Sequence, residues 1–184
     1  KSPSSGMQRI KVYNEQSGIP VHTGVGIFAR MFMDRFPLLP VEDEGRLHDP
    51  RLRENYIESL FVFKRWRDLA SNRKIAGALV DFHTRHKLLI MSHSQQHYRE
   101  MGKLVSRIKS EGPARTCSRY EAMLMQALSL LPTVKKHTNV LYHLMGYFKT
   151  MLSADEKQEL LEVIDRYHTN MVPLIVPLTL IQHY

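Results

Sequence analysis

Apolar residues recur at three- and four-residue steps over most of the chain, which is the spacing of amphipathic helices. The clearest case follows Asp49-Pro50, because a carboxylate just before a proline is typical of a helix start. This helix is expected to end near Ser71. Its buried side is expected to consist of Leu52, Tyr56, Leu60, Phe63, Trp66 and Ala70.

The same spacing predicts most of the remaining helices. They are expected over residues 24–36, 75–91, 94–110, 118–131, 134–152 and 154–169, with a last helix or turn near Pro173 and Pro177. In the first of them the buried side should carry Ile27, Phe28, Met31 and Met33. The helix at 154–169 has the clearest start, because Ser153 and Glu156 have the spacing of a capping box.

Residues 1–22 differ from the rest, since they are rich in Ser, Gly and Pro and contain one strand-like piece, Ile10 to Tyr13. This stretch is typical of a loop or a hairpin arm. The pattern as a whole predicts an all-α fold, an irregular bundle of seven to eight helices with a short non-helical N-terminal arm. The expected organisation is an arm at 1–22, a junction helix with a proline-rich loop at 23–49, and a helical domain at 50–184.

Composition adds a positive charge to this picture. The 184 residues carry a formal net charge of +8, which favours a polyanionic partner such as RNA, DNA, a nucleotide or an anionic surface. The alternative is that the protein is simply basic. A long apolar run and a signal peptide are both missing, so we expect no membrane association. Both ends of the sequence are expected to be cut, since it starts at Lys1 and stops in an apolar run.

Cysteine usage points to a reducing compartment. Cys117 is the single cysteine, which excludes an internal disulfide and fits a cytoplasmic protein. No activating base stands near it in the sequence, so buried filler is the favoured interpretation and a catalytic thiol the weaker one.

A first cluster of polar residues occupies two neighbouring helices. Its candidate ligand-binding residues are His83, Arg85, Lys87, His93, Ser94, Tyr98 and Arg99. If the helices meet near Ser92 to Ser94, these side chains converge at a helix N-terminus, where exposed amides favour an anion such as phosphate. The alternative is a solvated helix corner capped by serine. Histidines three and four apart can share a metal, but HExxH, CxxC and a third carboxylate are missing, so we expect no metal site.

A second cluster lies on the helix that begins near Val134. Asn139, His143, Gly146 and Tyr147 share one side of it, and three of them could bind a ligand. Gly146 costs a helix about 1 kcal/mol relative to alanine, which is tolerated where something approaches closely. Close packing of another helix is the favoured interpretation, and a ligand is the alternative. A separate basic row, Arg99, Lys103 and Arg107, could follow phosphates or simply face water.

Three separated segments resemble a known family. DFHTRHKLLIMSHSQQHYREMG, HTNVLYHLMGYFK and VPLIVPLTLIQHY are similar, in this order, to the signature segments of the YbgA-like family, a bacterial domain family of unknown function. The resemblance covers about residues 50–184. It strengthens the two clusters without giving them a mechanism, because the candidate residues lie within the first two segments.

The N-terminal part resembles a fused form of that family, in which the domain follows a thiouracil desulfidase-like domain. KSPSSG is similar to the desulfidase segment KSPSCG, and the stretch from Gly24 to Asn55 resembles the end of that domain and the junction. Such desulfidases remove sulfur from thiolated bases with an iron–sulfur cluster held by three cysteines. The position of one ligand cysteine is occupied by Ser5, so we expect no cofactor in this chain and transfer no desulfidase activity to it.

The leading hypothesis is an accessory domain that binds a nucleobase, nucleotide or RNA for a sulfur-removing partner. Arg85, Lys87 and Arg99 would hold phosphate, and Tyr98, His143 and Tyr147 would stack on or hydrogen-bond a base. The expected partners are a desulfidase-like domain or protein, and RNA or a thiolated nucleotide. One alternative is a stand-alone enzyme with His83, His93 or His143 as general base. The other is a structural or interaction domain, so whether the chain is an enzyme stays open.

Overall fold

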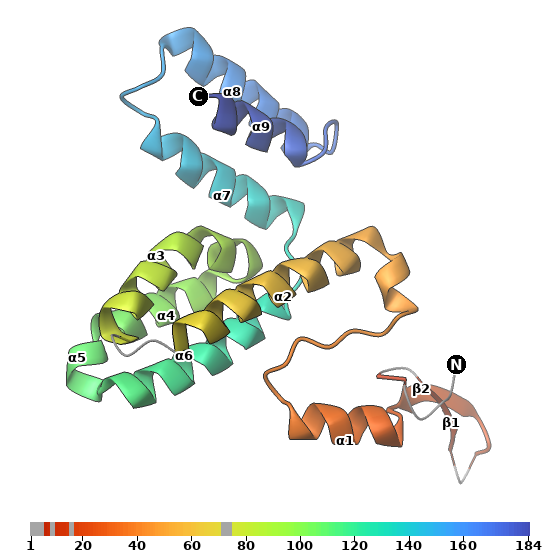
Figure 1. The fold of residues 1–184 in the computed structure, drawn as a ribbon. Helices are drawn as coiled ribbons and strands as arrows, with labels where there is room; N and C mark the ends of the chain where they lie inside the picture. The colour runs from red at the N-terminus through yellow and green to blue at the C-terminus, as the bar shows by residue number, and fades with distance from the viewer. Residues whose placement is uncertain (1–5, 8–9, 15–16, 71–74) are drawn as a thin grey trace. The chain divides into compact units, whose positions relative to one another are not determined.

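The computed structural model describes residues 6–7, 10–14, 17–70 and 75–184. The predictions at Ser5 and Ser71 lie outside these residues. The chain divides into two compact units, Lys1–Ser71 and Asn72–Tyr184, and each is described by itself below (Figure 1). The predicted domain boundaries stay predictions, since compact packing alone does not define a domain.

The first unit begins with a hairpin, which is one of the two forms, loop or hairpin, that the sequence predicted for the N-terminal arm. Strands β1 (Ile10–Tyr13) and β2 (Pro20–Gly24) pair antiparallel, with Ile10 opposite Gly24. Gly24 is required at this point, because a Cβ there would lie 2.7 Å from the Val12 Cγ1 atom and 2.9 Å from the Ile10 carbonyl oxygen. The prediction of a hairpin arm is therefore confirmed.

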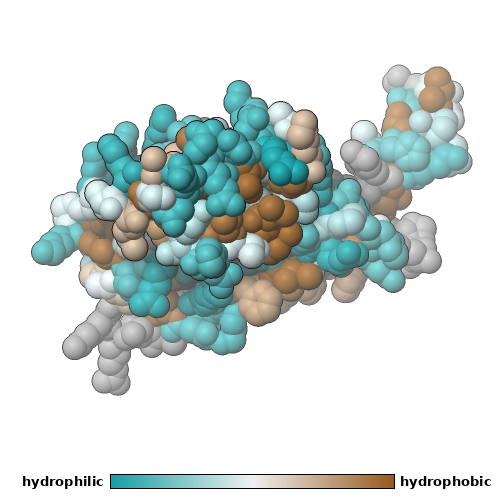
Figure 2. All heavy atoms as spheres, turned by 90° about the horizontal axis from the view of Figure 1, so that it is seen from above, coloured by the Kyte–Doolittle hydropathy of each residue, from teal (hydrophilic) through white to brown (hydrophobic). Residues whose placement is uncertain are grey.

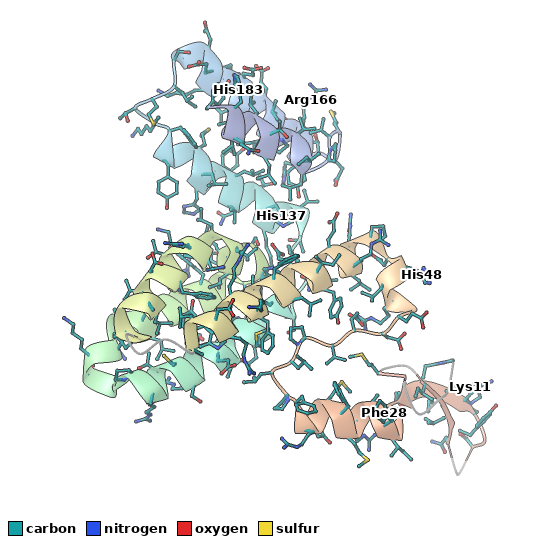
Figure 3. The ribbon with its side chains drawn as sticks, viewed as in Figure 1. Lys11, Phe28, His48, His137, Arg166 and His183 are labelled. Atoms are coloured by element: carbon teal, nitrogen blue, oxygen red, sulfur yellow. The ribbon has the colours of Figure 1, made fainter. Side chains whose placement is uncertain are left out.

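Helix α1 (Ile27–Arg35) shows that its predicted burial was wrong. Ile27, Phe28 and Met31 are 76%, 63% and 68% exposed, and Ala29 is the buried residue of the helix. Figure 3 shows Phe28 on this helix. The periodicity marks which side of a helix is apolar, but burial also needs a partner surface against that side.

Helix α2 (Pro50–Ala70) follows a short 3₁₀ helix, η2 (Arg46–His48). The start was predicted correctly, since the Asp49 carboxylate accepts from the backbone N–H groups of Arg51 and Leu52 at 2.8 and 3.3 Å. The buried stripe was partly wrong. Trp66 is buried as predicted, but Leu60 and Ala70 are exposed, and Ser59 and Val62 are buried instead. The buried side is thus rotated slightly from the expected one, because α2 carries apolar residues on more than one side.

The second unit begins with a group of four helices. They are α3 (Ile75–His93), α4 (Gln95–Ser106), α5 (Ile108–Glu111) and α6 (Pro113–Leu128). Helices α3, α4 and α6 pack on one another. The buried apolar side chains of this layer include Leu79, Phe82, Ile90, Met101, Leu104, Tyr120, Leu124 and Leu128.

Helix α6 starts five residues before its predicted start at Ser118. The segment SEGPART contains Gly112 and Pro113 and was interpreted as a loop. In the structure Gly112 has φ +85°, a conformation that favours glycine, and Pro113 takes the first helical position, where its missing N–H costs nothing. Gly112 and Pro113 therefore end helix α5 and start helix α6.

The unit ends with three helices, α7 (Val134–Tyr147), α8 (Ala154–His168) and α9 (Ile175–His183). They enclose a second apolar core, formed by Leu141, Leu152, Leu160, Ile164 and Tyr167. The capping box is confirmed: Ser153 Oγ accepts from the Glu156 amide at 3.3 Å, and the Glu156 carboxylate accepts from the Ser153 amide at 2.7 Å. Helix α7 ends at Tyr147, five residues earlier than predicted.

The predicted fold class is confirmed, because the described residues form nine α-helices and one two-stranded sheet. The helix count exceeds the predicted seven to eight. The predicted helix at 94–110 is interrupted at Arg107 into α4 and α5, and residues 175–183 form a full helix. Among the described residues, none of the helices combines the length and apolar character that crossing a membrane requires.

Candidate functional site

His83 lies buried inside the α3, α4 and α6 layer. Its Nδ1 atom is 3.1 Å from the Tyr120 hydroxyl on α6. A Cβ on Gly102 of α4 would lie 3.6 Å from its Nε2 atom, so α4 passes close to the other edge of the ring. Burial lowers the pKa of His83 below its usual 6.5, and the positive charges of Lys87 and His86 lower it further. His83 is therefore a buried residue that lies between three helices, and its burial disfavours the charged imidazolium.

His93 is fully buried at the end of α3. Its Nδ1–H donates to the carbonyl oxygen of Leu130 at 2.7 Å, and the ammonium of Lys136 on α7 donates to the His93 carbonyl oxygen. A cation at a helix C-terminus satisfies an otherwise unpaired carbonyl and suits the helix dipole. These contacts tie the end of α3 to the segment that leads into α7.

The start of α4 is capped from within the chain. Ser94 Oγ accepts from the His97 backbone N–H at 3.3 Å and lies 2.8 Å from His97 Nδ1. Tyr98 is half-buried and Arg99 is exposed on the same helix. The Ser94 hydroxyl therefore already accepts the hydrogen bond of the His97 amide, which is one of the amides expected to bind a phosphate.

Two residues of the first cluster have different environments on α3. Arg85 is exposed and pairs with Asp81 at 3.1 Å. Lys87 is half-buried, and its ammonium lies 5.8 Å from the centroid of the Tyr147 ring on α7. This distance is within the range of a cation–π interaction. Lys87 and Tyr147 therefore bring the two predicted clusters together, although 60 positions separate them in the sequence.

The second cluster forms a row along α7. Asn139 is half-buried, whereas His143 and Tyr147 are exposed at successive steps of four residues on the same side. The favoured interpretation of Gly146 was wrong, because a Cβ there would have no described heavy atom within 4 Å. The side of α7 at Gly146 is open. We refer to Lys87, Asn139, His143 and Tyr147 as the α3–α7 site.

The α3–α7 site offers a definite set of chemical groups. Tyr147 is 59% exposed, and the Lys87 ammonium lies over its aromatic ring. Asn139 supplies an amide and His143 an imidazole, and both can donate and accept hydrogen bonds. Among the described residues, no three His, Cys, Asp or Glu side chains are arranged to hold a metal ion.

Comparison with known proteins gives a family. Residues 87–184 match the family model described as "Protein of unknown function (DUF1722)". The chain is also 33% identical over 135 residues to "Uncharacterized protein YbgA" of Escherichia coli (strain K12), an alignment that covers 73% of this chain and 80% of that protein. The chain belongs to the DUF1722 family. No solved structure matches it.

The YbgA-like part of the predicted resemblance is thereby confirmed, and the fusion to a desulfidase-like domain stays a prediction. The DUF1722 match starts at Lys87 and includes helices α4 to α9 completely. Both Lys87 and Tyr147 lie within it. His83 and Arg85 precede it, although the YbgA-like segment quoted above includes both.

Sequence reasoning missed the partners of the buried histidines. Tyr120 and Lys136 were not considered, and the pair His137 and Tyr167, whose Nδ1 and hydroxyl are 2.8 Å apart, joins α7 to α8 in the same way. Figure 3 shows His137 near the start of α7. The available signal was a tyrosine on an apolar helix side, because a buried hydroxyl needs a hydrogen-bond partner.

Proposed function

We propose that this DUF1722 chain binds a phosphorylated aromatic ligand at the α3–α7 site, either a free nucleotide or a nucleotide within single-stranded RNA. The observation that supports the proposal is the ammonium of Lys87, 5.8 Å from the centroid of the exposed Tyr147 ring. A cation close to an exposed aromatic ring suits a ligand that combines a planar base with a phosphate.

The energetics of such a contact are favourable. Stacking of a base on an aromatic side chain contributes about 1–3 kcal/mol. Lys87 would pair with the phosphate, and Asn139 and His143 would hydrogen-bond the edges of the base. His143 is exposed on the same side of α7 as Tyr147, so its ring is accessible to a ligand.

The net charge of the chain supports an anionic ligand. The 184 residues carry a formal net charge of +8. A net positive charge raises the concentration of polyanions near the surface and their association rate. In the full proposal, the ligand carries a thiolated base and is presented to a sulfur-removing partner domain or protein.

A structural role is favoured for two histidines that are not part of the α3–α7 site. His83 and His93 are buried, and each hydrogen-bonds within the chain. We therefore infer a structural role for these two residues. An enzyme with a histidine general base would then have to use the exposed His143, whose substitution by alanine should abolish an activity and leave the melting temperature nearly unchanged.

The test is a titration of the purified chain with tRNA, with nucleotides and with thiolated nucleotides, at low and at physiological ionic strength. We expect binding that weakens with salt. Binding of the free nucleotides would identify a nucleotide site, and binding of tRNA alone would identify an RNA site. A preference for thiolated ligands would support the sulfur-removing partner. No binding of any of these at low salt would overturn the proposal.

Three variants locate the binding. Tyr147→Leu should weaken it about five- to a hundredfold, which corresponds to the stacking energy of one base. Lys87→Gln should reduce the slope of log affinity against log salt concentration by about 1, the value expected for one lost phosphate contact. Tyr142→Leu is the matched control, since Tyr142 is 44% exposed on the same helix but is not part of the α3–α7 site. An equal loss in the control would show that the site is elsewhere.

A further inference from the structure

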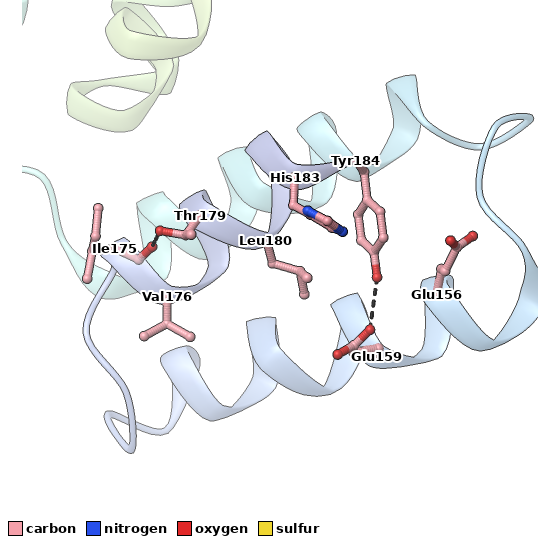
Figure 4. Close-up of a pocket in the computed structure, with 8 residues that line it drawn as sticks. All are labelled: Glu156, Glu159, Ile175, Val176, Thr179, Leu180, His183 and Tyr184. Carbon is pink, nitrogen blue, oxygen red and sulfur yellow. Dashed lines mark hydrogen bonds between the residues drawn. The ribbon is translucent and has the colours of Figure 1, made fainter.

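A groove lies between α8 and α9, apart from the α3–α7 site (Figure 4). Its volume is about 760 Å³. The two helices run antiparallel, because Tyr184 at the end of α9 donates from its hydroxyl to the Glu159 carboxylate, in the first half of α8, at 2.9 Å. The groove is open to solvent along its length, so a partner could enter it from the side.

The two ends of the groove differ chemically. One end is apolar and is lined by Ile175 and Val176, with Leu180 near the middle (Figure 4). The other end carries the carboxylates of Glu156 and Glu159. Hydrogen bonds from Ser153 lower the pKa of Glu156. Burial raises the pKa of the Tyr184 phenol, and its hydrogen bond with Glu159 raises it further. This end of the groove therefore presents two carboxylates beside the one imidazole of His183, which favours a cationic side chain.

The packing of the three C-terminal helices leaves room for a fourth. Helix α7 packs against α8 and touches α9, and the groove lies between α8 and α9. Ile175 is 64% exposed and Val176 is 38% exposed. Four-helix bundles bury such apolar positions with a helix laid between two antiparallel neighbours.

In Figure 2, hydrophobic side chains form separate patches within a mostly hydrophilic face.

Charge decides what kind of helix fits. Helix α8 contains five acidic and two basic residues, in a chain whose net charge is +8. The acidic end would repel an acidic partner and attract a Lys or Arg. The net charge of +8 repels a cation from the chain as a whole, so the attraction of a cationic partner to these carboxylates is local.

We propose that the groove between α8 and α9 binds a basic amphipathic helix of another protein. Its apolar side chains lie on Ile175, Val176 and Leu180, and a Lys or Arg lies between Glu156 and Glu159. The nine residues of α9 span about 14 Å at 1.5 Å per residue, so two to three turns of the partner fill the groove. This is the helix-in-groove mode of peptide recognition.

The experiment uses the full chain and a fluorescent helical peptide of about 18 residues, long enough to span the groove with both ends free. The peptide has Leu on one side and Lys elsewhere, and a second peptide has Glu in place of every Lys. We expect the Leu–Lys peptide to bind in a one-to-one complex and the Leu–Glu peptide to bind at least tenfold more weakly, about 1.4 kcal/mol.

Variants test both ends of the groove. Glu156→Gln with Glu159→Gln should weaken the Leu–Lys peptide about tenfold, since each exposed pair contributes up to about fivefold. Glutamine still fits a capping box and still accepts from Tyr184, so the fold should persist. Glu162→Gln is the control for a lost charge on α8, because it removes one carboxylate from a residue that does not line the groove.

At the apolar end, Ile175→Asp should abolish binding, and an acidic residue suits the first turn of α9. Leu178→Asp, on the same helix but outside the groove lining, is its control. Helix content and the melting curve of every variant show whether it is folded. If Ile175→Asp does not fold, the charge variants decide alone.

The outcomes are distinct. Binding that both groove variants weaken, and both controls retain, supports the proposal. No binding of the Leu–Lys peptide overturns it, and so does an equal loss with Glu162→Gln. Sedimentation of the chain alone provides a third result, since a dimer that Ile175→Asp dissociates would mean that a second copy covers the groove. That result would also overturn the proposal.

Discussion

Replacing Tyr120 by phenylalanine removes one buried oxygen and very little volume. Tyr120 is fully buried on α6, and its hydroxyl lies 3.1 Å from the Nδ1 atom of buried His83 on α3. The aromatic ring stays, so its edge contact with Phe82, at a centroid distance of 6.1 Å, should persist. The substitution therefore isolates the hydrogen bond between α3 and α6 from the apolar packing around it.

The expected cost follows from the burial of His83. A typical internal hydrogen bond contributes about 1 kcal/mol net, but a buried polar atom that loses its partner costs about 1–3 kcal/mol. His83 Nδ1 cannot recover the bond from bulk water without opening the α3–α6 contact. We expect the free energy of unfolding to fall by about 1–3 kcal/mol and the melting temperature by about 2–4 °C for each kcal/mol.

Urea unfolding followed by far-ultraviolet circular dichroism measures this change. The urea dependence should keep its slope, because the surface exposed on unfolding is the same. Tyr142→Phe is the control, since Tyr142 is 44% exposed on α7, and its effect should stay within about 0.5 kcal/mol. A double-mutant cycle with His83→Leu should give a coupling energy of about 0.5–3 kcal/mol between the two positions.

A Tyr120→Phe variant as stable as the wild type would refute a stabilising hydrogen bond between the Tyr120 hydroxyl and His83. It would also be refuted if His83→Leu left the cost of Tyr120→Phe unchanged, because the hydroxyl would then act on something other than the imidazole. A change in the urea slope would point to a different folded state instead.

Three further predictions concern stability. The pKa of His83 is lower in the folded chain than its unfolded value of 6.5, so the unfolded chain binds more protons and the free energy of unfolding should fall as pH drops below 6.5. His83→Leu should reduce the dependence of this free energy on pH, measured by urea unfolding between neutral and mildly acidic pH. Leu160→Ala, in the second core, should cost about 2–5 kcal/mol in thermal or urea unfolding, and Leu161→Ala, at an exposed neighbour, less than about 1 kcal/mol. Ser153→Ala, which removes the N-cap of α8, should cost about 1 kcal/mol, and Ser153→Thr should restore most of it.

The helices and their starts could be predicted from the sequence wherever the signal is local. Asp49 and Ser153 act through backbone groups within three residues, so their caps were visible without tertiary information. The start of helix α6 was predicted five residues too late, because a Gly-Pro pair such as Gly112-Pro113 occurs both in loops and at helix starts. Tertiary packing decides whether such a pair lies in a loop or starts a helix, and the folded structure shows that here it starts a helix.

The candidate site could be predicted only in part, for the same reason. Spacing placed Asn139, His143 and Tyr147 on one side of a helix, but it contains no information on what lies opposite. The contacts of Lys87 with Tyr147 and of His83 with Tyr120 join residues 60 and 37 positions apart. Helical periodicity does not extend across such separations.

The buried pair of His83 and Tyr120 has a consequence for how this family can be compared across species. Exchanging Tyr120 alone leaves His83 Nδ1 without the hydroxyl that it contacts, inside an apolar layer. Positions 83 and 120 are therefore expected to vary together, as a histidine with a tyrosine or as two apolar residues. A histidine that is shared by many relatives at position 83 would then record the architecture of the helices, and the search for chemistry is better directed at positions 143 and 147.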